Sequence, residues 1–341
     1  MQMLDCLHRQ GVIHMQQNSK IKGILFSLIF ALPAYWLGEH YPLIGGPVFG
    51  ILLGLIAAKI PRSKSFDPGI RFTGKKILQY SIILLGFEMN LFQVLNIGAT
   101  SFSVMICTLL TAFGVAYWVG KQLGLEKHTT ILIGAGTAIC GGSAIAAAAP
   151  VIGAKDKDIA FSISTIFLFN ILAVFIFPAL GHLMGLSDLG FGMWAGTAIN
   201  DTSSVVAAAY SYSPAAGSYA TIVKLTRALM IIPVCLLLAF FTARQKESTS
   251  SFQLKNIFPW FILWFVFACI IHTTGIVPEQ ISQDLGALGK FSIILAMSAI
   301  GLNTDILALF RNGLRPIILG LCCWFAVAVV SLLVQHFIGL I

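Results

Sequence analysis

The sequence predicts an all-α polytopic membrane protein with the inverted-repeat architecture found among transporters. Of its 341 residues, 57% are hydrophobic and only 10% are charged, whereas a soluble domain carries roughly 25% charged residues. Apolar runs of about 20 residues, enough to cross a ~30 Å hydrocarbon core, recur from Ile21 to the C-terminus. Two further apolar segments with polar centres repeat each other. This composition excludes a soluble globular enzyme.

Basic residues give the chain a net charge of +8, but they lie in short loops between apolar runs. That placement is typical of cytoplasmic loops, so we interpret the charge as membrane topology and expect the lipid bilayer, not nucleic acid, as partner. The seven cysteines form no CxxC pair and no cluster with histidine, which predicts neither a metal site nor a cofactor. Residues 1–20 lack an apolar signal core, and we assign them to a cytoplasmic N-terminal segment without a removable signal peptide.

Residues 21–341 form a single predicted transmembrane domain. It has about nine full spans, and hydropathy places them, in chain order, at 23–37, 44–60, 72–90, 100–119, 158–182, 218–243, 256–274, 288–309 and 316–339. Two other apolar stretches, 130–153 and 190–212, carry glycine or small polar residues at their centres. These two are predicted to be broken or re-entrant helical segments.

The two broken stretches are copies of one element. GTAICGGSAIAAAAP from Gly136 and GTAINDTSSVVAAAY from Gly196 share eight of fifteen aligned positions at a spacing of 60 residues. Duplicated elements of this kind are characteristic of secondary transporters. We therefore expect two related units, 128–185 and 188–245, each made of a broken stretch and the helix that follows it.

The placement of lysines favours hairpins over full crossings for the two broken stretches. Lys121 and Lys127 precede the first stretch and Lys155 and Lys157 follow it, whereas no lysine or arginine flanks the second. With two re-entrant hairpins, 18 of the 21 basic residues fall on the cytoplasmic side, as the positive-inside rule expects. A broken full-length helix remains the alternative, and it has the same break near the bilayer midplane.

A fainter repeat predicts inverted symmetry. The 25 residues from Gly74 align without gaps with those from Gly289, and four positions are identical. In the hairpin topology the first copy starts inside and the second outside, and the C-terminus is periplasmic. Residues 44–120 and 256–340 are then predicted to form a frame around the two hairpin units.

Polar residues at the two breaks predict an anion site. Gly141 and Gly142 break the first stretch, and Ser143 is placed as the N-cap of its second arm. In the second stretch Asn200, Asp201, Thr202 and Ser203 take the same part, and Cys140 lies beside the first break. Both second arms then begin near mid-membrane, where their free N–H groups and positive dipole ends attract an anion. A packing kink relieved by glycine is the alternative.

Three ionisable residues fall within the apolar segments near these breaks. Asp201 is the only carboxylate expected near mid-membrane, where such residues are usually functional. It is a candidate for binding a coupling proton or sodium ion, for the counter-ion of Lys224 and Arg227, or for a simple helix cap. Lys224 and Arg227 lie three residues apart, on one helix face. They either reach out to the interface or, outnumbering the one carboxylate, bind an anionic substrate.

Several segments resemble the YeiH-type family of bacterial inner-membrane proteins, which are described as sulfate exporters. They are GTAICGGSAIAAAAPVIGAKDKDIAFS, GTAINDTSSVVAAAYSYS, ATIVKLTRALMIIP, IGGPVFGILLGL and GLNTDILAL. The resemblance covers essentially the whole chain after residue 20. It implies a multi-pass secondary transporter of the cell inner membrane, with export as its direction.

We therefore predict a secondary transporter of a small anion, with sulfate or a sulfonate first among the candidates. Ser143, Ser203 and the backbone at both breaks would coordinate the anion, Lys224 and Arg227 would neutralise it, and Asp201 would couple its movement to a proton or sodium ion. A sodium/proton antiporter with Asp201 as ion site is the alternative. No catalytic constellation stands out, so an enzyme is not expected, and a sensor would need an output domain. A homo-oligomer is compatible with the sequence.

Overall fold

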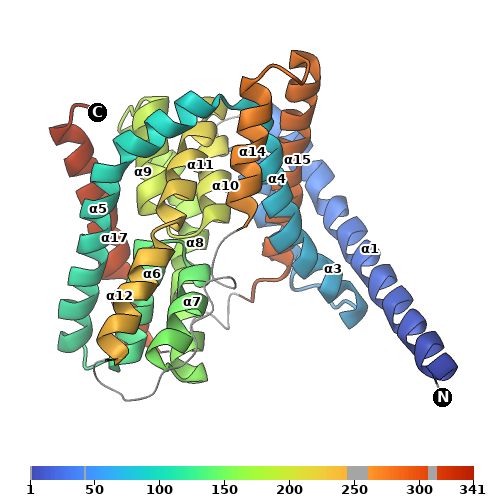
Figure 1. Ribbon diagram of the computed structural model, residues 1–341, viewed down its shortest axis with the longest axis horizontal. Helices are drawn as coiled ribbons and strands as arrows, with labels where there is room; N and C mark the ends of the chain where they lie inside the picture. Colours follow the sequence, from blue (N-terminus) through green and yellow to red (C-terminus); the bar gives the residue numbers. More distant parts are fainter. Residues whose placement is uncertain (1, 42–43, 244–259, 306–312) are drawn as a thin grey trace. The chain divides into compact units, whose positions relative to one another are not determined.

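A computed structural model describes residues 2–41, 44–243, 260–305 and 313–341, and every regular element in these ranges is helical. The chain divides into two compact units (Figure 1). Unit 1 comprises Met1–Glu88 and Phe267–Asp305, and unit 2 comprises Met89–Val266 and Ile306–Ile341. Each unit is therefore built from two separate parts of the sequence. The predicted division into a frame and two hairpin units stays a prediction.

Unit 1 is a bundle around two long helices, α1 and α15. Between them in the sequence lies a run of short elements that continue one another from Lys64 to Glu88 and include a π-helical turn. The elements are α1 (Gln2–His40), α2 (Gly46–Ala57), η1 (Lys64–Phe66), α3 (Asp67–Phe72), η2 (Thr73–Ile77), α4 (Leu78–Leu85), η3 (Gly86–Glu88) and α15 (Glu279–Leu302), while α14 (Phe261–Thr273) contains the boundary between the units.

Small residues set the packing of α2 against α15 in unit 1. A β-carbon on Gly54 would lie 2.3 Å from the carbonyl oxygen of Ser298, and one on Gly301 would lie 2.4 Å from that of Ile51. The two backbones approach this closely because neither glycine carries a side chain. An ion pair adds to the unit nearby, where Lys290 Nζ lies 3.0 Å from Glu88 Oε2.

Unit 2 carries both repeated stretches. Each stretch folds as two short helices of similar length separated by a break of a few residues. The helices of the unit are α5 (Leu91–Gln122), α6 (Lys127–Ala138), α7 (Gly142–Ile152), α8 (Asp156–Leu183), α9 (Asp188–Ala198), α10 (Thr202–Tyr212), α11 (Pro214–Ala228), α12 (Ile231–Ala243) and α17 (Leu314–Phe337).

Local sequence explains where these helices begin. Asn90 starts α5 by accepting a hydrogen bond from Phe92 N at 2.9 Å, and Ser187 starts α9 by accepting one from Gly190 N at 3.1 Å. Ser213 accepts from Ala216 N at 3.0 Å, and Pro214 follows it at the first position of α11. Short polar N-caps and an N-terminal proline are the expected starts of helices.

Both broken stretches reverse direction at their breaks and are hairpins. Thr129 in the first turn of α6 donates a 2.7 Å hydrogen bond to Asp158 in the first turn of α8, just beyond α7. Ser213, which follows α10, donates a 2.6 Å hydrogen bond to Asp188 at the start of α9. If either stretch were one straight helix, these hydrogen-bonded residues would lie more than ~30 Å apart. Within unit 2, α6 and α7 lie together toward one end and α9 and α10 toward the other (Figure 1).

Helix α17 packs on α5 and is also bonded to α9. The indole Nε1 of Trp194 donates to the carbonyl oxygen of Ala328 at 3.0 Å, and the hydroxyls of Thr197 and Ser331 lie 2.6 Å apart. Gln335 Nε2 extends this chain of contacts by donating to Ser331 Oγ at 3.2 Å. The first arm of the second hairpin is thereby fixed to a long helix near the C-terminus.

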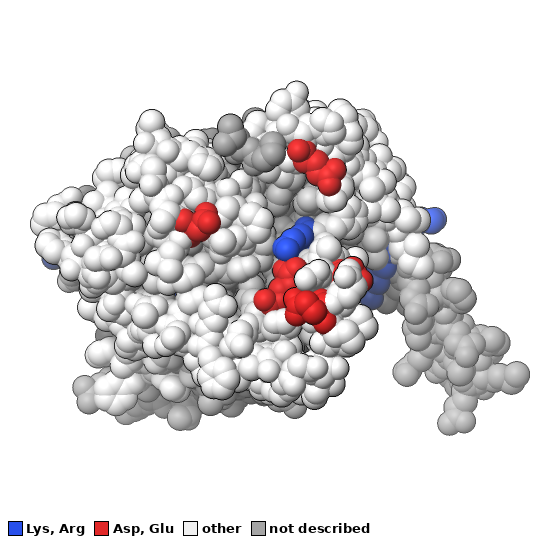
Figure 2. Space-filling model, turned by 90° about the horizontal axis from the view of Figure 1, so that it is seen from above, with Lys and Arg blue, Asp and Glu red and all other residues white. Residues whose placement is uncertain are grey.

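Six of the described helices are long and apolar enough to cross a membrane, so the expected nine or so full spans are not confirmed. The predicted spans 44–60 and 256–274 fall on α2 and α14, which have 12 and 13 described residues and reach only ~18–20 Å at 1.5 Å per residue. The predicted span 72–90 is interrupted by the π-helical turn. Uncharged residues cover most of the face seen in Figure 2, as the composition requires.

Candidate functional site

The tips of the two hairpins meet inside unit 2. A β-carbon on Gly141 would lie 3.3 Å from the Cβ of Asp201. Gly141 has a φ of 70°, a backbone conformation that glycine adopts without the steric cost other residues incur. The two breaks therefore lie side by side, although about 60 residues separate them in the sequence.

Two cations of α11 lie behind these tips. The side chains of Lys224 and Arg227 are both 0% exposed, so neither reaches the interface by extending outward. Lys224 Nζ donates to the carbonyl oxygens of Ile139 and Ile199, each at 2.8 Å. Its three-residue spacing from Arg227 places both side chains against the same two hairpins.

Arg227 contacts the last turns of the same two arms. Its Nε donates to the carbonyl oxygen of Ala138 at 2.7 Å and its Nη2 to that of Thr137 at 2.6 Å. Its Nη1 donates to the carbonyl oxygen of Thr197. The acceptors are carbonyls that a helix leaves without an intrahelical partner at its C-terminus. Lys224 and Arg227 are therefore buried C-caps of the first arms, a favourable position for cations near the negative dipole end.

These contacts follow the sequence repeat. Thr137 and Thr197 hold the same position in the two GTAI segments, as do Ile139 and Ile199. Each equivalent pair shares one cation: the threonine carbonyls share Arg227 and the isoleucine carbonyls share Lys224. The identity of the two GTAI segments was a signal for this arrangement, but sequence reasoning considered only their polar neighbours.

The cations were expected to face Asp201 and an anion. In the part of the chain that the structure describes, their hydrogen bonds go to carbonyl oxygens, and neither cation forms an ion pair with Asp201. The broken helices leave these carbonyl groups beside the cations, and buried carbonyls must be bonded. That the cations bind an anion stays a prediction.

The second arms begin with different caps. Asp201 is the N-cap of α10, and its Oδ2 accepts from Ser203 N at 3.0 Å and also from the Ser203 hydroxyl. In α7 the N-cap is Gly141, not Ser143 as predicted. The chain turns two residues earlier than expected, at Gly141, whose φ is positive. Ser143 is consequently exposed at the second position of the helix.

The remaining predicted residues differ in their exposure. Thr202 is half-buried and Gly142 is also half-buried, whereas Cys140 is buried. Asn200 is 1% exposed, and neither its Oδ1 nor its Nδ2 has a hydrogen-bond partner among the described residues. A buried amide without partners is rare in proteins and invites a ligand or an ordered water.

Asn170 is a residue of the site outside the predicted set. It lies in the middle of α8, is buried, and its Oδ1 accepts a hydrogen bond from Asp201 N at 3.1 Å. This contact fixes the backbone of the second tip from outside the hairpin. No group of three or more His, Cys, Asp or Glu side chains in the described ranges is arranged to hold a metal ion.

Comparison with known proteins gives consistent matches over nearly the whole chain. A family model described as conserved hypothetical protein 698 matches residues 22–320. A UPF0324 membrane protein of Fusobacterium nucleatum is 45% identical over 95% of this chain and 99% of its own length. Relatives with the same description from Streptococcus agalactiae and Streptococcus pyogenes are 46% and 47% identical over 94% of this chain and 98% of theirs.

Proposed function

The chain belongs to the family described as conserved hypothetical protein 698, whose relatives are membrane proteins, and on this premise we propose that it is a secondary transporter of a small anion. The observation that carries the proposal is the meeting of two hairpin tips over two buried cations. Paired broken helices at mid-membrane are a recurrent way of building transporter sites. A sulfate exporter, as the resemblance to the YeiH-type family implies, is the form we favour.

A count of charges at the tips supports an anion. Lys224 and Arg227 contribute two positive charges and Asp201 one negative charge. The C-terminal ends of α6 and α9 contribute about −0.5 each, and the N-terminal ends of α7 and α10 about +0.5 each. The helix ends cancel, and a surplus of about one positive charge remains. A monoanion or one charge of a divalent anion would neutralise it in a medium where isolated charge is costly.

The groups available to the anion lie on the second arms. Free N–H groups at the starts of α7 and α10 point toward the tips, as in other anion sites at helix N-termini. Ser143 and Thr202 add accessible hydroxyls, and Asn200 adds an amide that has no hydrogen-bond partner among the described residues. A tetrahedral oxyanion such as sulfate or a sulfonate offers several acceptor oxygens to these donors. In this proposal Lys224 and Arg227 act through their charge and by holding the tips.

The coupling ion is assigned to Asp201. Its carboxylate is half-buried and caps α10 through Ser203, so protonation or sodium binding would alter both the charge and the cap. We further propose that the N-terminus is cytoplasmic and the C-terminus periplasmic, which keeps the lysines near α6 and α8 on the cytoplasmic side.

A ligand screen on purified protein in detergent tests the proposal. The melting temperature is measured with sulfate, sulfite, taurine, acetate and sodium chloride over a range of pH, for the wild type and for Thr202→Val and Asn200→Ala. We expect one oxyanion class to raise the melting temperature of the wild type and to lose that effect in both variants. Thr226→Val is the matched control, because among the described residues the Thr226 hydroxyl bonds within its own helix, to the carbonyl oxygen of Ile222 at 3.0 Å.

Flux in proteoliposomes completes the test. Labelled sulfate should exchange across the membrane in the wild type and the Thr226→Val control, and slow in the two tip variants. Stabilisation by sodium or pH alone, lost in Asp201→Asn, would instead identify a sodium/proton antiporter. If the purified protein chemically converted a labelled anion, the protein would be an enzyme and the transport proposal would fail.

A further inference from the structure

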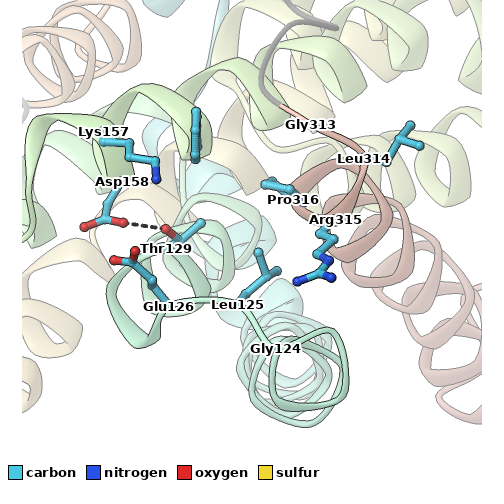
Figure 3. A pocket seen from close by; sticks show the side chains of 11 residues that line it. Gly124, Leu125, Glu126, Thr129, Lys157, Asp158, Gly313, Leu314, Arg315 and Pro316 are labelled. Atoms are coloured by element: carbon cyan, nitrogen blue, oxygen red, sulfur yellow. Dashed lines mark hydrogen bonds between the residues drawn. The ribbon is translucent and has the colours of Figure 1, made fainter.

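A pocket of about 470 Å³ lies at one end of unit 2, far along the hairpins from their tips. It is lined by the α5–α6 connection and by the first turns of α8 and α17, and we call it the α8–α17 pocket (Figure 3). Lys157 projects into it from one side and Arg315 from the other. The proposed transport site does not use any residue of this pocket.

The charged side chains of the pocket differ in burial and in hydrogen bonding. Asp158 is buried and already accepts hydrogen bonds from Thr129 Oγ1 at 2.7 Å and from Lys155 N at 3.2 Å. Lys157 is exposed and lies over the ring of Phe161, with Nζ 5.4 Å from its centroid. Arg315 is exposed as well. The lining has as many carboxylates as cations, but Asp158 is buried, so the groups exposed to a ligand are the two cations and the carboxylate of Glu126.

The backbone adds to this positive character. Arg315 lies in the first turn of α17, a helix of 24 residues whose N-cap, Gly313, provides no side-chain hydrogen bond. The uncapped N–H groups and the positive end of the helix dipole therefore act together with the Arg315 guanidinium. Guanidinium groups bind phosphate oxygens in a bidentate geometry, and a lysine opposite them supplies a second charge.

The position of the pocket identifies the source of the phosphate. Helices α5, α8 and α17 are all long and apolar enough to span a membrane, and the pocket lies where α5 ends and where α8 and α17 begin. Such helix ends lie at the level of the lipid headgroups. Apolar side chains, Leu125, Phe161 and Pro316, share the lining with the charges, which suits a ligand that is polar at one end only.

We propose that the α8–α17 pocket binds the phosphodiester group of a membrane phospholipid, held between Lys157 and Arg315. Basic pockets between transmembrane helices bind lipid headgroups in this way. Glu126 faces the remainder of the headgroup, where a hydroxyl or an ammonium would pair with it. The bound lipid would tie α17 to the first hairpin across the mouth of the pocket.

Native mass spectrometry of the purified full-length protein tests this proposal, with phosphatidylglycerol, diacylglycerol of the same acyl chains, and inorganic phosphate as probes. We expect a phosphatidylglycerol adduct and no diacylglycerol adduct on the wild type. The double variant Lys157→Gln, Arg315→Gln should retain about five-fold less phosphatidylglycerol or less still, since both charge-assisted contacts are lost. The matched control is Lys127→Gln, an exposed lysine at the same end of the unit that does not line the pocket.

The possible results separate clearly. Equal loss of phosphatidylglycerol in the Lys127→Gln control would reduce the effect to general surface charge and overturn the proposal. Equal retention of phosphatidylglycerol and diacylglycerol by the wild type would overturn it without any variant. Binding of inorganic phosphate that depends on Lys157 and Arg315, without lipid binding, would assign the pocket to a soluble phosphate and overturn the lipid assignment.

Discussion

Thr137 and Thr197 occupy the same position in the two hairpins, and both carbonyl oxygens accept hydrogen bonds from the guanidinium group of Arg227. One planar group thereby fixes the last turns of α6 and α9 relative to each other. Arginine suits this task because its five donors have a fixed planar geometry. The two hairpins are thus held together by one buried charged side chain.

Replacement of Arg227 is expected to reduce stability more than replacement of Lys224. Arg227→Gln leaves three carbonyl acceptors for the two N–H donors of one shorter side chain, whereas Lys224→Gln affects only two acceptors. Each buried group left without a partner costs about 1–3 kcal/mol, so Arg227→Gln should lower stability by several kcal/mol. Thermal unfolding in detergent measures both effects. Lys121→Gln, at the exposed end of α5, should leave the melting temperature unchanged, and an Arg227→Gln protein as stable as that control would contradict the capping role.

Much of the hairpin architecture could be predicted from the sequence. The GTAI repeat, the glycines at 141 and 142 and the lysines around α6 and α8 all pointed to two short arms that return to the side they entered. These features act locally or through simple charge rules, and the chain does reverse at both breaks. The side of the membrane on which each hairpin opens stays a prediction. Helix boundaries near Asn90, Ser187 and Ser213 also follow from side chains within three residues.

The partners of the buried cations could not be predicted in the same way. A sequence records side chains, whereas Lys224 and Arg227 bond to backbone carbonyls that become available only when two helices end beside them. The count of full spans is not confirmed, for a related reason. Hydropathy does not register the π-helical turn at Thr73–Ile77 or the early ends of α2, because packing against neighbours decides them.

Adjacent glycines at the first tip are expected to respond differently to alanine. Gly141 has a positive φ and would place a β-carbon 3.3 Å from the Cβ of Asp201, whereas no atom of the described residues lies within 4 Å of a β-carbon on Gly142. Gly141→Ala should therefore cost about 1–2 kcal/mol and slow sulfate flux by moving the second tip. Gly142→Ala should keep the wild-type melting temperature. Equal behaviour of the two variants would mean that the tips are not in contact.

Labelling from each side of the membrane tests the hairpin topology. In a cysteine-free background, Lys127→Cys and Lys157→Cys should react with an impermeant maleimide from the cytoplasmic side only, because α6 and α7 return to that side. Ala215→Cys, exposed at the start of α11, should react from the periplasmic side only. Ala148→Cys, which is 1% exposed, is the unreactive control. Labelling of Lys127→Cys and Lys157→Cys from opposite sides would restore the full-crossing alternative.

Close packing in unit 1 predicts a strong effect of a single methyl group. Gly54→Ala would place its β-carbon 2.3 Å from the Ser298 carbonyl oxygen, so α2 and α15 must separate, at a cost of about 1–3 kcal/mol. Gly114→Ala is the matched control, since nothing lies within 4 Å of a β-carbon there and alanine favours a helix interior. The melting temperature should fall for the first variant and stay level or rise for the second.

Asp201→Asn separates the structural role of this residue from its charge. Asparagine caps helices about as well as aspartate. Its side-chain oxygen can therefore still accept the hydrogen bond from Ser203 N, which is 3.0 Å long in the wild type. The variant should therefore fold with a melting temperature close to that of the wild type.

The negative charge of Asp201 is lost in this variant, which raises the positive surplus at the tips from about one to about two. Sulfate should then bind at least as tightly as to the wild type, while its transport loses its dependence on a proton or sodium gradient. Binding isotherms and counterflow, which needs no coupling ion, measure the two effects separately. If sulfate binding disappeared while the fold persisted, Asp201 itself would be needed to bind the anion, and its assignment to the coupling ion would fail.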